Sequence, residues 1–557
     1  MLSFDSNPVV FLGIGYGLLW VVSALAVSSV WLRPNTVWRS RTFFLLLALG
    51  AVAFMRLPSV VFNQELNPDE SQMVAQVITL QYDPVFWRSV DGTTGGPLNN
   101  YVLLIPGWFG LSYDYISTRL TGLVLILATL WLLFRTLESW FGENVARWSL
   151  LPPLVLLAMT QNADLVHYSS EYLPNFLLGL LYYGYARFLR ETIPSGSRLY
   201  WFGMVAGMVP FSKLQAVPML FCAGLFVAID ILTRANLTGG VKAKKLLLLL
   251  LGGLSFPVLV ILLTLSTGVF EDMITFYFIG NLNYGGDGQW SSHLLRLPAF
   301  LQRVEEFSWF MWLSGLLGIT FLLFFVQNRF RLHTNRKIWA FLLSLLGFTF
   351  MAITRTGTEY IHHLLFLVVP VGLLNGWFLS EISQASRANK RLAPTLAIVT
   401  LAAALVPYGV RYVSRALHRT PLNSYVQNSR QVPQSAVTQR ILQYAKPGEK
   451  LVVWGWQCKY YVEAQMPQGV NENHSIRSIF NHPLRDAYQK RYIRDIRRSM
   501  PPVFVDAVGN SLWLSDRATE GHETIAPLRD LIATKYRFAG EIDNTRIYVR
   551  TDRYQQP

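Results

Sequence analysis

The stretch that decides the fold is KAKKLLLLLLGGLSFPVLVILLTLST, from Lys242 to Thr267. Three lysines are followed by 22 residues, Leu246 to Thr267, that include no charged side chain. A helix of about 20 apolar residues is long enough to cross the hydrocarbon core of a bilayer. This stretch therefore predicts a membrane-spanning helix with a basic loop at its start.

Similar apolar runs recur along the 557 residues, of which 52% are hydrophobic and only 15% charged. Soluble domains carry roughly 25% charged residues, and these runs are too many for a single buried core. We predict a polytopic α-helical membrane protein with about 11–13 transmembrane helices. The candidate spans are residues 8–32, 42–60, 115–134, 146–160, 172–189, 199–211, 214–233, 246–267, 308–326, 338–354, 361–380 and 392–412.

The formal net charge of +15 raises the question of nucleic-acid binding. Lys and Arg gather in alternate loops, whereas residues 62–113 contain one Arg and no Lys. Basic loops stay cytoplasmic, so this distribution accounts for the excess charge and argues against a nucleic-acid partner. It predicts a multi-pass protein of the inner (plasma) membrane, with both termini on the extracytoplasmic side. The basic loops are residues 31–41, 187–198, 233–245, 328–337 and 386–391.

The cysteines and the first apolar segment give two further expectations, on disulfides and on a signal peptide. The chain has two cysteines, Cys222 in an apolar span and Cys458 near the C-terminus, so no disulfide framework is indicated. The first apolar segment lacks a basic n-region and a small-residue cleavage site. We expect it to be an uncleaved helix rather than a signal peptide.

The composition changes after about residue 413. Residues 414–439 are polar and look like a linker. Strands are predicted in KLVVWGW, PVFVDAV and TRIYVR, with helices in HPLRDAYQKRYIRDIRRSM and IAPLRDLIATKY between them. We expect a transmembrane domain (1–413) with large extracytoplasmic loops at 61–114 and 268–307, and a small extracytoplasmic α/β domain (440–557).

The first candidate site is QELNPDESQ, Gln64 to Gln72. Asn67 and Pro68 suit the start of a helix, and Glu70 can act as a capping-box partner. Helix initiation accounts for Glu70 better than for Asp69, whose carboxylate has no needed capping role. Met73, Val74, Val77 and Ile78 then share one face, which favours a helix lying on the membrane surface.

The second candidate is NADLVHYSSEYLPNF, Asn162 to Phe176. Asp164, His167 and Glu171 are spaced by three and four residues, so they share a face if the stretch is helical. Titratable groups at a membrane boundary favour a functional site. The alternative is a solvated loop end with a capping Glu.

Basic candidates lie on the same expected side. Lys213 separates two apolar half-segments and can bind an anion or extend to the interface. Arg355, His362 and His363 lie at the mouth of a later span and offer donors suited to phosphate oxygens. Anchoring of the helix end is the alternative explanation for them, and Arg296 and Arg303 are weaker candidates.

These stretches together suit transfer from a lipid-linked phosphosugar, whose phosphate leaves without protonation. A carboxylate can activate the attacking hydroxyl, while cations stabilise the charge that develops on the leaving phosphate.

The chain resembles the GT-C superfamily of membrane glycosyltransferases, and within it the family 39-like relatives of protein O-mannosyltransferases and of lipid A aminoarabinose transferase. The resemblance rests on NPDE, GGPLNNY, HYSSEYLPNFLLGLLYY, SKLQAVPML, GTEYIHHLLFLVVPVGLL and the tail segment GEKLVVWGW. It extends over nearly the whole chain in order, through short and permissive motifs. It implies a GT-C fold and an inverting transfer of a sugar from a polyprenyl phosphate to a glycan, lipid or protein acceptor. Membrane lipids are further expected partners.

The resemblance also implies roles for individual residues. Asp69 is expected to be the general base, Glu171 the second acidic residue, and Lys213, Arg355, His362 and His363 the donor-phosphate site. Glu70, His167 and Asp164 are candidate contacts to sugar or acceptor. The resemblance fixes no cofactor and leaves a divalent metal, Mg²⁺ or Mn²⁺, open, with Asp69 and Glu171 as the expected ligands if they converge.

Two other function classes remain open at this stage. One is a polymerase, ligase or oligosaccharyltransferase that uses a diphosphate-linked oligosaccharide. The other is a lipid or solute transporter, against which the two halves show no similarity and the polar candidates favour the boundary over the bilayer midplane.

Overall fold

The computed structural model describes residues 7–28, 36–284, 290–329, 331–385, 392–425 and 431–554. The chain forms two compact units. We call them the membrane unit (Met1–Val60, Gly122–Leu259 and Gly285–Val426) and the mixed unit (Val61–Thr121, Val260–Tyr284 and Gln427–Pro557). The end of the first predicted span, the basic loop 386–391 and parts of the loop 268–307 and of the linker lie outside the described residues.

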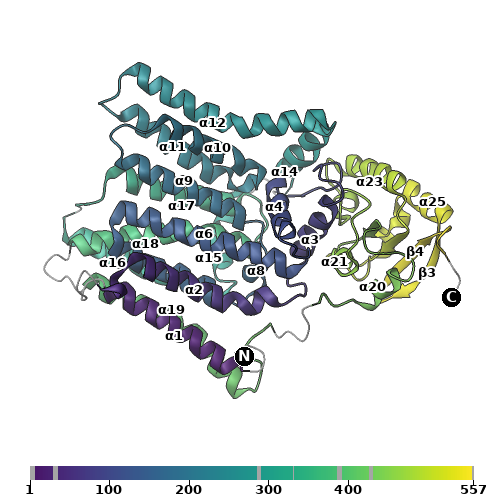
Figure 1. Ribbon diagram of the computed structural model, residues 1–557, viewed down its shortest axis with the longest axis horizontal. Coiled ribbons are helices and arrows are strands. Elements are labelled where there is room, and N and C mark those ends of the chain that lie inside the picture. Colours follow the sequence, from purple (N-terminus) through teal and green to yellow (C-terminus); the bar gives the residue numbers. More distant parts are fainter. Residues whose placement is uncertain are drawn as a thin grey trace. The chain divides into compact units, whose positions relative to one another are not determined.

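The membrane unit is helical, and Figure 1 shows its long helices side by side. Each of the twelve predicted spans contains a helix. These helices are α1 (Pro8–Ser28), α2 (Arg41–Val61), α6 (Tyr115–Phe141), α7 (Glu143–Met159), α9 (Tyr172–Arg190), α10 (Gly196–Met208), α11 (Val217–Thr233), α12 (Gly239–Ser266), α16 (Glu305–Gln327), α17 (Arg336–Thr354), α18 (Leu365–Ala385) and α19 (Leu392–Leu417). Shorter elements are η1 (Val37–Arg39), α8 (Ala163–Val166), η3 (Val209–Phe211), η4 (Leu214–Ala216), α15 (Trp290–Leu301) and η6 (Ile361–Leu364).

Eight helical segments of the described chain are long and apolar enough to cross a membrane, which makes the chain a multi-pass membrane protein. Burial separates their roles. The segment of η6 and α18 is 89% buried in its most apolar window and packs against α7, α16 and α17, so it forms the core of the unit. The corresponding window of α12 is only 11% buried, as expected for a helix that faces lipid.

Glycines let α10 and α12 approach closely. A Cβ added at Gly203 would lie 2.2 Å from the carbonyl oxygen of Leu249, and one at Gly252 would lie 2.0 Å from that of Tyr200. Small residues at such contacts allow helix backbones to pack together inside a membrane. The GG pair of the Lys242–Thr267 stretch therefore has a packing role.

The mixed unit contains a four-stranded sheet in the order β1-β2-β4-β3. Its strands are β1 (Leu451–Trp454), β2 (Val503–Asp506), β3 (Tyr536–Ile542) and β4 (Thr545–Arg550). β1 and β2 are parallel, and the other two pairings are antiparallel. Its helices are α3 (Pro68–Leu80), α4 (Pro97–Tyr101), η2 (Val102–Leu104), α5 (Ile105–Trp108), α13 (Phe270–Asp272), η5 (Met273–Ile279), α14 (Gly280–Leu282), α20 (Ala436–Ile441), α21 (Lys459–Ala464), α22 (Ile476–Ile479), α23 (Arg485–Ser499), α24 (Arg517–Glu520), η7 (His522–Thr524) and α25 (Ala526–Lys535).

The sheet confirms the predicted α/β character, and β3 is a strand that the sequence interpretation missed. β3 and β4 are joined by Asp543 and Asn544, whose φ angles are +48° and +55°. Two consecutive residues with positive φ form the tight hairpin turn that matches strand twist, and Asp and Asn tolerate this conformation. This turn signal was present in the sequence.

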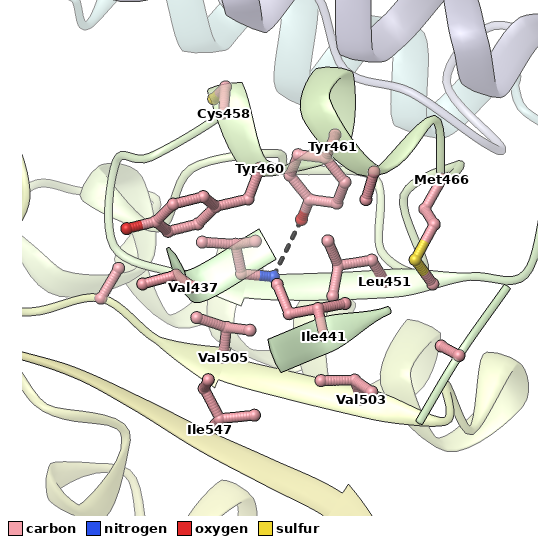
Figure 2. Packing of buried hydrophobic residues seen from close by; sticks show 14 of the residues in the cluster. Val437, Ile441, Leu451, Cys458, Tyr460, Tyr461, Met466, Val503, Val505 and Ile547 are labelled. Carbon is pink, nitrogen blue, oxygen red and sulfur yellow. Dashed lines mark hydrogen bonds between the residues drawn. The ribbon is translucent and has the colours of Figure 1, made fainter. Parts of the chain in front are cut away.

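One face of the sheet packs against helices. Figure 2 shows Leu451, Val503, Val505 and Ile547 beneath the aromatic rings of α21. The Tyr461 hydroxyl accepts a 2.9 Å hydrogen bond from the Val453 backbone N–H, so its polar end is satisfied within an apolar core. Ala75 of α3 belongs to the same cluster.

The expectation of a helix lying on the membrane surface is wrong for α3. Every residue of α3 from Glu70 to Leu80 is buried. The face with Val74 and Ile78 packs against Tyr115 and Val462, while Ala75 packs into the sheet core. The apolar periodicity was recognised correctly, but its partner is protein rather than lipid.

Candidate active site

The start of α3 is formed as its sequence predicts. The Asn67 side chain accepts a 2.8 Å hydrogen bond from the Asp69 backbone N–H, and Pro68 occupies the first helical position. The Asp69 side chain is partly exposed, and no described residue forms a hydrogen bond or ion pair with its carboxylate. Asp69 is thus held in place through its backbone while its carboxylate is available for chemistry.

The Glu70 side chain, unlike that of Asp69, is paired. Arg119 Nε donates to Glu70 Oε1 at 2.8 Å, and Arg119 Nη2 lies 2.5 Å from Glu70 Oε2. Both side chains are almost completely buried. Arg119 also donates to the backbone oxygens of Phe62 and Gln64, which ties the residues before α3 to the start of α6. A substrate contact by Glu70 would require this bidentate pair to open.

A second carboxylate lies in the same motif. Glu65 accepts a hydrogen bond from Ser71, whose hydroxyl is also 2.8 Å from the Tyr115 hydroxyl. Burial raises the pKa of the Glu65 carboxyl above its ordinary value, although the Ser71 hydrogen bond opposes the change. The sequence interpretation passed over Glu65, although it is an acidic residue within the motif already singled out.

The membrane unit contains the second cluster. Lys213 forms a buried ion pair with Glu171 and donates a 2.7 Å hydrogen bond to the Ser170 hydroxyl. Ser169 also donates to the Glu171 carboxylate. Lys213 lies between η3 and η4, where the chain leaves the helical path beside Pro210. The break between the two half-helices therefore brings the ammonium to the start of α9.

Electrostatics keep Glu171 ionised. Burial alone would raise its pKa, but Lys213 and the imidazoles of His362 and His363 outweigh that effect, so the pKa of Glu171 lies below its ordinary value. Glu171 is consequently a carboxylate that orients Lys213 and is poorly suited to donate a proton.

Two histidines complete this cluster. The rings of His362 and His363 are 4.9 Å apart, and Tyr360 stacks on His362 at 5.4 Å. Nδ1 of His363 is buried and has no hydrogen-bond partner among the described residues. An ammonium N–H of Lys213 is also left over, since an ammonium has three donors and two described acceptors. The remaining ammonium N–H of Lys213 suits an incoming anion.

Glu171, His167 and Asp164 are not on one continuous helix, so the shared face expected for a helical stretch is absent. α8 ends at Val166, and the chain is irregular until α9 begins at Tyr172. His167 is buried with its ring 6.0 Å from that of His362, and its Nδ1 lies 2.9 Å from the Ala163 backbone oxygen. Asp164 is in the first turn of α8, where its N–H donates to the Asn162 side chain.

The remaining basic candidates differ in their surroundings. Arg355 is exposed after α17 and makes no ion pair with any described residue. Arg303 pairs with Glu359 and donates to its backbone oxygen at 3.2 Å. Arg296 is exposed in α15. Of the predicted phosphate group, Lys213, His362 and His363 are brought together with Glu171, whereas no described contact joins Arg355 to them.

Comparison with solved structures identifies the architecture of the chain. The solved structure of ArnT from Cupriavidus metallidurans bound to undecaprenyl phosphate matches 93% of this chain and 100% of its own, with a TM-score of 0.53 and 12% identity. The chain has the GT-C fold. Weaker matches are an Archaeoglobus fulgidus oligosaccharyltransferase complex with Zn and sulfate (TM-score 0.41, 12% identity, 90% and 73% covered) and apo ArnT from Cupriavidus metallidurans (0.40, 12%, 91% and 98%). No family model and no curated protein matched.

Glu171, His362 and His363 also have ligand atoms within 4.8 Å of one another, a spacing that a metal ion could bridge. The ammonium of Lys213 already contacts the Glu171 carboxylate. A divalent cation there would have to displace Lys213 or be repelled by it, so this donor set fits an anion better than a metal.

The other group with metal-ligand spacing is Asp506, His522 and Glu523. His522 Nδ1 lies 2.5 Å from Asp506 and 3.2 Å from Glu523. Arg517 and Arg546 pair with the two carboxylates at 3.2 and 3.1 Å. These cations already neutralise the carboxylates, which favours a structural network at the end of β2.

A buried charge cluster in the mixed unit escaped the sequence interpretation. Arg491 of α23 pairs with Asp91 and lies 3.5 Å from Glu472, with its guanidinium 3.5 Å from the centre of the Phe276 ring. Burial raises the pKa of Glu472 to about 8, against the opposing effect of Arg491. Three distant segments supply these residues, so no local motif could have revealed the cluster.

Proposed function

We propose that this protein is a glycosyltransferase that moves a sugar from a polyprenyl-phosphate donor to an acceptor hydroxyl on the extracytoplasmic face of the inner membrane. The observation that carries the proposal is the orientation of Lys213. Glu171 and Ser170 hold its ammonium and leave one N–H free, beside a buried His363 nitrogen that lacks a partner. Ammonium N–H groups are donors that bind a phosphate oxygen.

These donors would act on the leaving group. As the bond between the anomeric carbon and the phosphate oxygen breaks, the electron pair and the negative charge move to the lipid phosphate. Lys213 stabilises that charge in the transition state, and His362 and His363 pack together in the same cluster. Arg355, which is exposed at the C-terminal end of α17, is a further cation for the donor phosphate. No proton donor is needed on this side.

Asp69 would act on the attacking group. Its carboxylate accepts the proton of the acceptor hydroxyl while the oxygen forms its bond to the anomeric carbon from the face opposite the phosphate, which inverts the configuration. The support is the free carboxylate on a rigid helix start. A metal is not required, because protein cations can neutralise the phosphate.

The class of donor is carried over from the fold. The ArnT structure with the same architecture contains undecaprenyl phosphate, a polyprenyl phosphate. We propose the same class of lipid for this chain, with a glycan, lipid or protein as acceptor. We also propose that residues 440–557 form an extracytoplasmic domain and that residues 1–413 form the membrane domain.

The test is turnover of donor by the purified full-length protein. It is incubated with a panel of polyprenyl-phosphate sugars and candidate acceptors, and released lipid phosphate is measured for the wild type, Asp69→Asn and the control Asp486→Asn. Asp486 is 83% exposed and makes only a 4.0 Å contact with Arg485. We expect at least a hundredfold loss for Asp69→Asn and none for the control.

Release from diphosphate-linked oligosaccharides alone would contradict the proposed donor and favour a polymerase or oligosaccharyltransferase. Full activity in Asp69→Asn would remove Asp69 from the role of base. Movement of intact lipid between leaflets without release of phosphate would indicate a transporter.

A further inference from the structure

A cavity far from Glu171 carries an inference independent of the proposed transfer. It lies in the membrane unit, has a volume of about 330 Å³, and is lined by Arg135, Glu138, Ser139, Tyr183, Arg187, Arg190, Glu191 and Arg198. Its volume falls in the lower part of the range for small-molecule sites, roughly 300–1,000 Å³. Four arginines face two glutamates, so the lining is positively charged.

The cavity is at the opposite end of α9 from the Lys213 cluster. Glu171 precedes the helix, whereas Arg187 and Arg190 are in its last turn. Its 19 residues, at about 1.5 Å each, separate the two ends by roughly 28 Å. This is close to the thickness of the hydrocarbon core of a bilayer, about 30 Å. The cavity is therefore not part of the candidate active site and lies at the other membrane boundary.

The arginines are not all neutralised. Arg135 contacts Glu138 at 2.8 Å, and Arg41, outside the lining, contacts the same carboxylate at 2.9 Å. Arg198 pairs with Glu191. Among the described residues, Arg187 hydrogen-bonds to the Tyr183 hydroxyl and forms no ion pair, and Arg190 forms no ion pair either. Lys245 adds a further cation beside Gly196, near the start of α10.

Two donors in the cavity lack an acceptor among the described residues. The Tyr183 hydroxyl accepts hydrogen bonds from Arg135 at 3.5 Å and Arg187 at 3.3 Å, and no described residue accepts its own proton. Nε of Arg135 is buried without a partner. A buried N–H without an acceptor is costly, and an anion with several oxygens would satisfy it together with the half-buried Tyr183 O–H.

Ordinary explanations account for part of this arrangement only. Arg187 and Arg190 suit the negative end of the α9 dipole, and arginines at membrane boundaries commonly extend toward water. Neither effect requires a cavity, nor a tyrosine whose oxygen is occupied by two guanidinium groups while its proton is free. Arginine forks around an O–H donor match phosphate oxygens.

We propose that this cavity binds a phosphate-bearing anion at the membrane boundary, with an anionic phospholipid headgroup as the main source. Basic pockets between membrane helices bind such headgroups. Arg187 and Arg190 contact the phosphate, Tyr183 donates its O–H, and Arg135 stabilises the bound charge from the more buried side.

The test uses purified full-length protein in detergent, with native mass spectrometry to count bound lipid during titration with phosphatidylglycerol or phosphatidylcholine. We expect phosphatidylglycerol to bind the wild type and phosphatidylcholine to bind at least tenfold more weakly. The double variant Arg187→Gln/Arg190→Gln should weaken phosphatidylglycerol binding at least tenfold. The matched control Arg331→Gln/Arg336→Gln removes two exposed arginines of another basic loop and should change it less than twofold.

Tyr183→Phe provides a second variant that keeps every charge. Loss of its O–H should weaken phosphatidylglycerol binding threefold or more, with Tm unchanged. Equal losses in the double variant and its control, or equal binding of both lipids, would overturn the proposal, since general surface charge would then explain binding. Inorganic phosphate at 10 mM, added as a competitor, distinguishes the two sources of the bound phosphate group. If it displaces the lipid, the site binds free phosphate as well. If the lipid stays bound, the site is specific for the headgroup.

Discussion

At the scale of single residues, the candidate site depends on which charges are paired. Asp69 and Glu70 are neighbours in sequence, yet Asp69 has a free carboxylate and Glu70 is locked to Arg119. Glu171 and Lys213 form a buried pair in the membrane unit. Removing one member of such a pair leaves an uncompensated charge, which costs more than removing both.

The Lys213 pair allows stability and function to be separated. Lys213→Met should lower the free energy of unfolding by about 3–5 kcal/mol, because Glu171 then remains buried without its partner. The double variant Glu171→Gln/Lys213→Met should recover most of the Tm but release no lipid phosphate. Recovered activity in the double variant would show that Lys213 does not contact the donor.

Glu472 predicts a pH dependence of stability. Its pKa rises from an ordinary value of 4.5 to about 8 in the folded chain, so the folded state binds the proton more tightly than the unfolded state. The stabilisation is therefore present in full below about pH 4.5 and is lost as the pH rises toward 8. Thermal unfolding at pH 5.5 and pH 8 should show a larger fall in Tm for the wild type than for Glu472→Gln. The exposed control Glu541→Gln should behave as the wild type, and parallel curves for all three proteins would contradict the assignment.

At the scale of elements, packing depends on what covers each apolar face. The face of α3 that resembled a membrane-surface helix is covered by Tyr115, Val462 and the sheet core. α12 has the most apolar sequence of the eight candidate spans and is the least buried of them. Hydropathy therefore identified elements well but not the neighbours that they contact.

The contact of α10 with α12 can be tested with alanine. Gly203→Ala places a Cβ 2.2 Å from the Leu249 carbonyl oxygen and should destabilise the protein by about 1–3 kcal/mol through overpacking. Gly224→Ala, in α11, meets nothing within 4 Å and should leave Tm equal or higher, because Ala favours helix. An unchanged Tm for Gly203→Ala would mean that the two helices are not in close contact.

At the scale of the whole molecule, the membrane orientation is the main expectation to test. Both native cysteines are buried, so single introduced cysteines can report accessibility. Arg529→Cys in α25 should react with a membrane-impermeant maleimide in intact spheroplasts, whereas Lys244→Cys in the basic N-terminal part of α12 should react only after lysis. The reverse pattern would place the C-terminal part in the cytoplasm and contradict transfer on the extracytoplasmic face.

The sequence alone determined the membrane class, a helix within each predicted span, the capped start of α3 and most of the C-terminal strands. These features depend on local information, namely hydropathy over about 20 residues, Asn-Pro at a helix start and alternating apolar residues. Local signals also existed for β3 and Glu65, since the Asp543-Asn544 turn and the acidic motif contain them.

Only the tertiary structure decided which charged groups meet. Glu171 and Lys213 are 42 residues apart, Glu70 and Arg119 are 49 apart, and Asp91 and Arg491 are 400 apart. The energy of a buried charge depends on its partner and on exclusion of water, and neither is encoded in the neighbouring residues. The sequence therefore supplied the candidate residues and the helices, whereas folding selected Asp69 as the free carboxylate and joined Lys213, Glu171 and the two histidines.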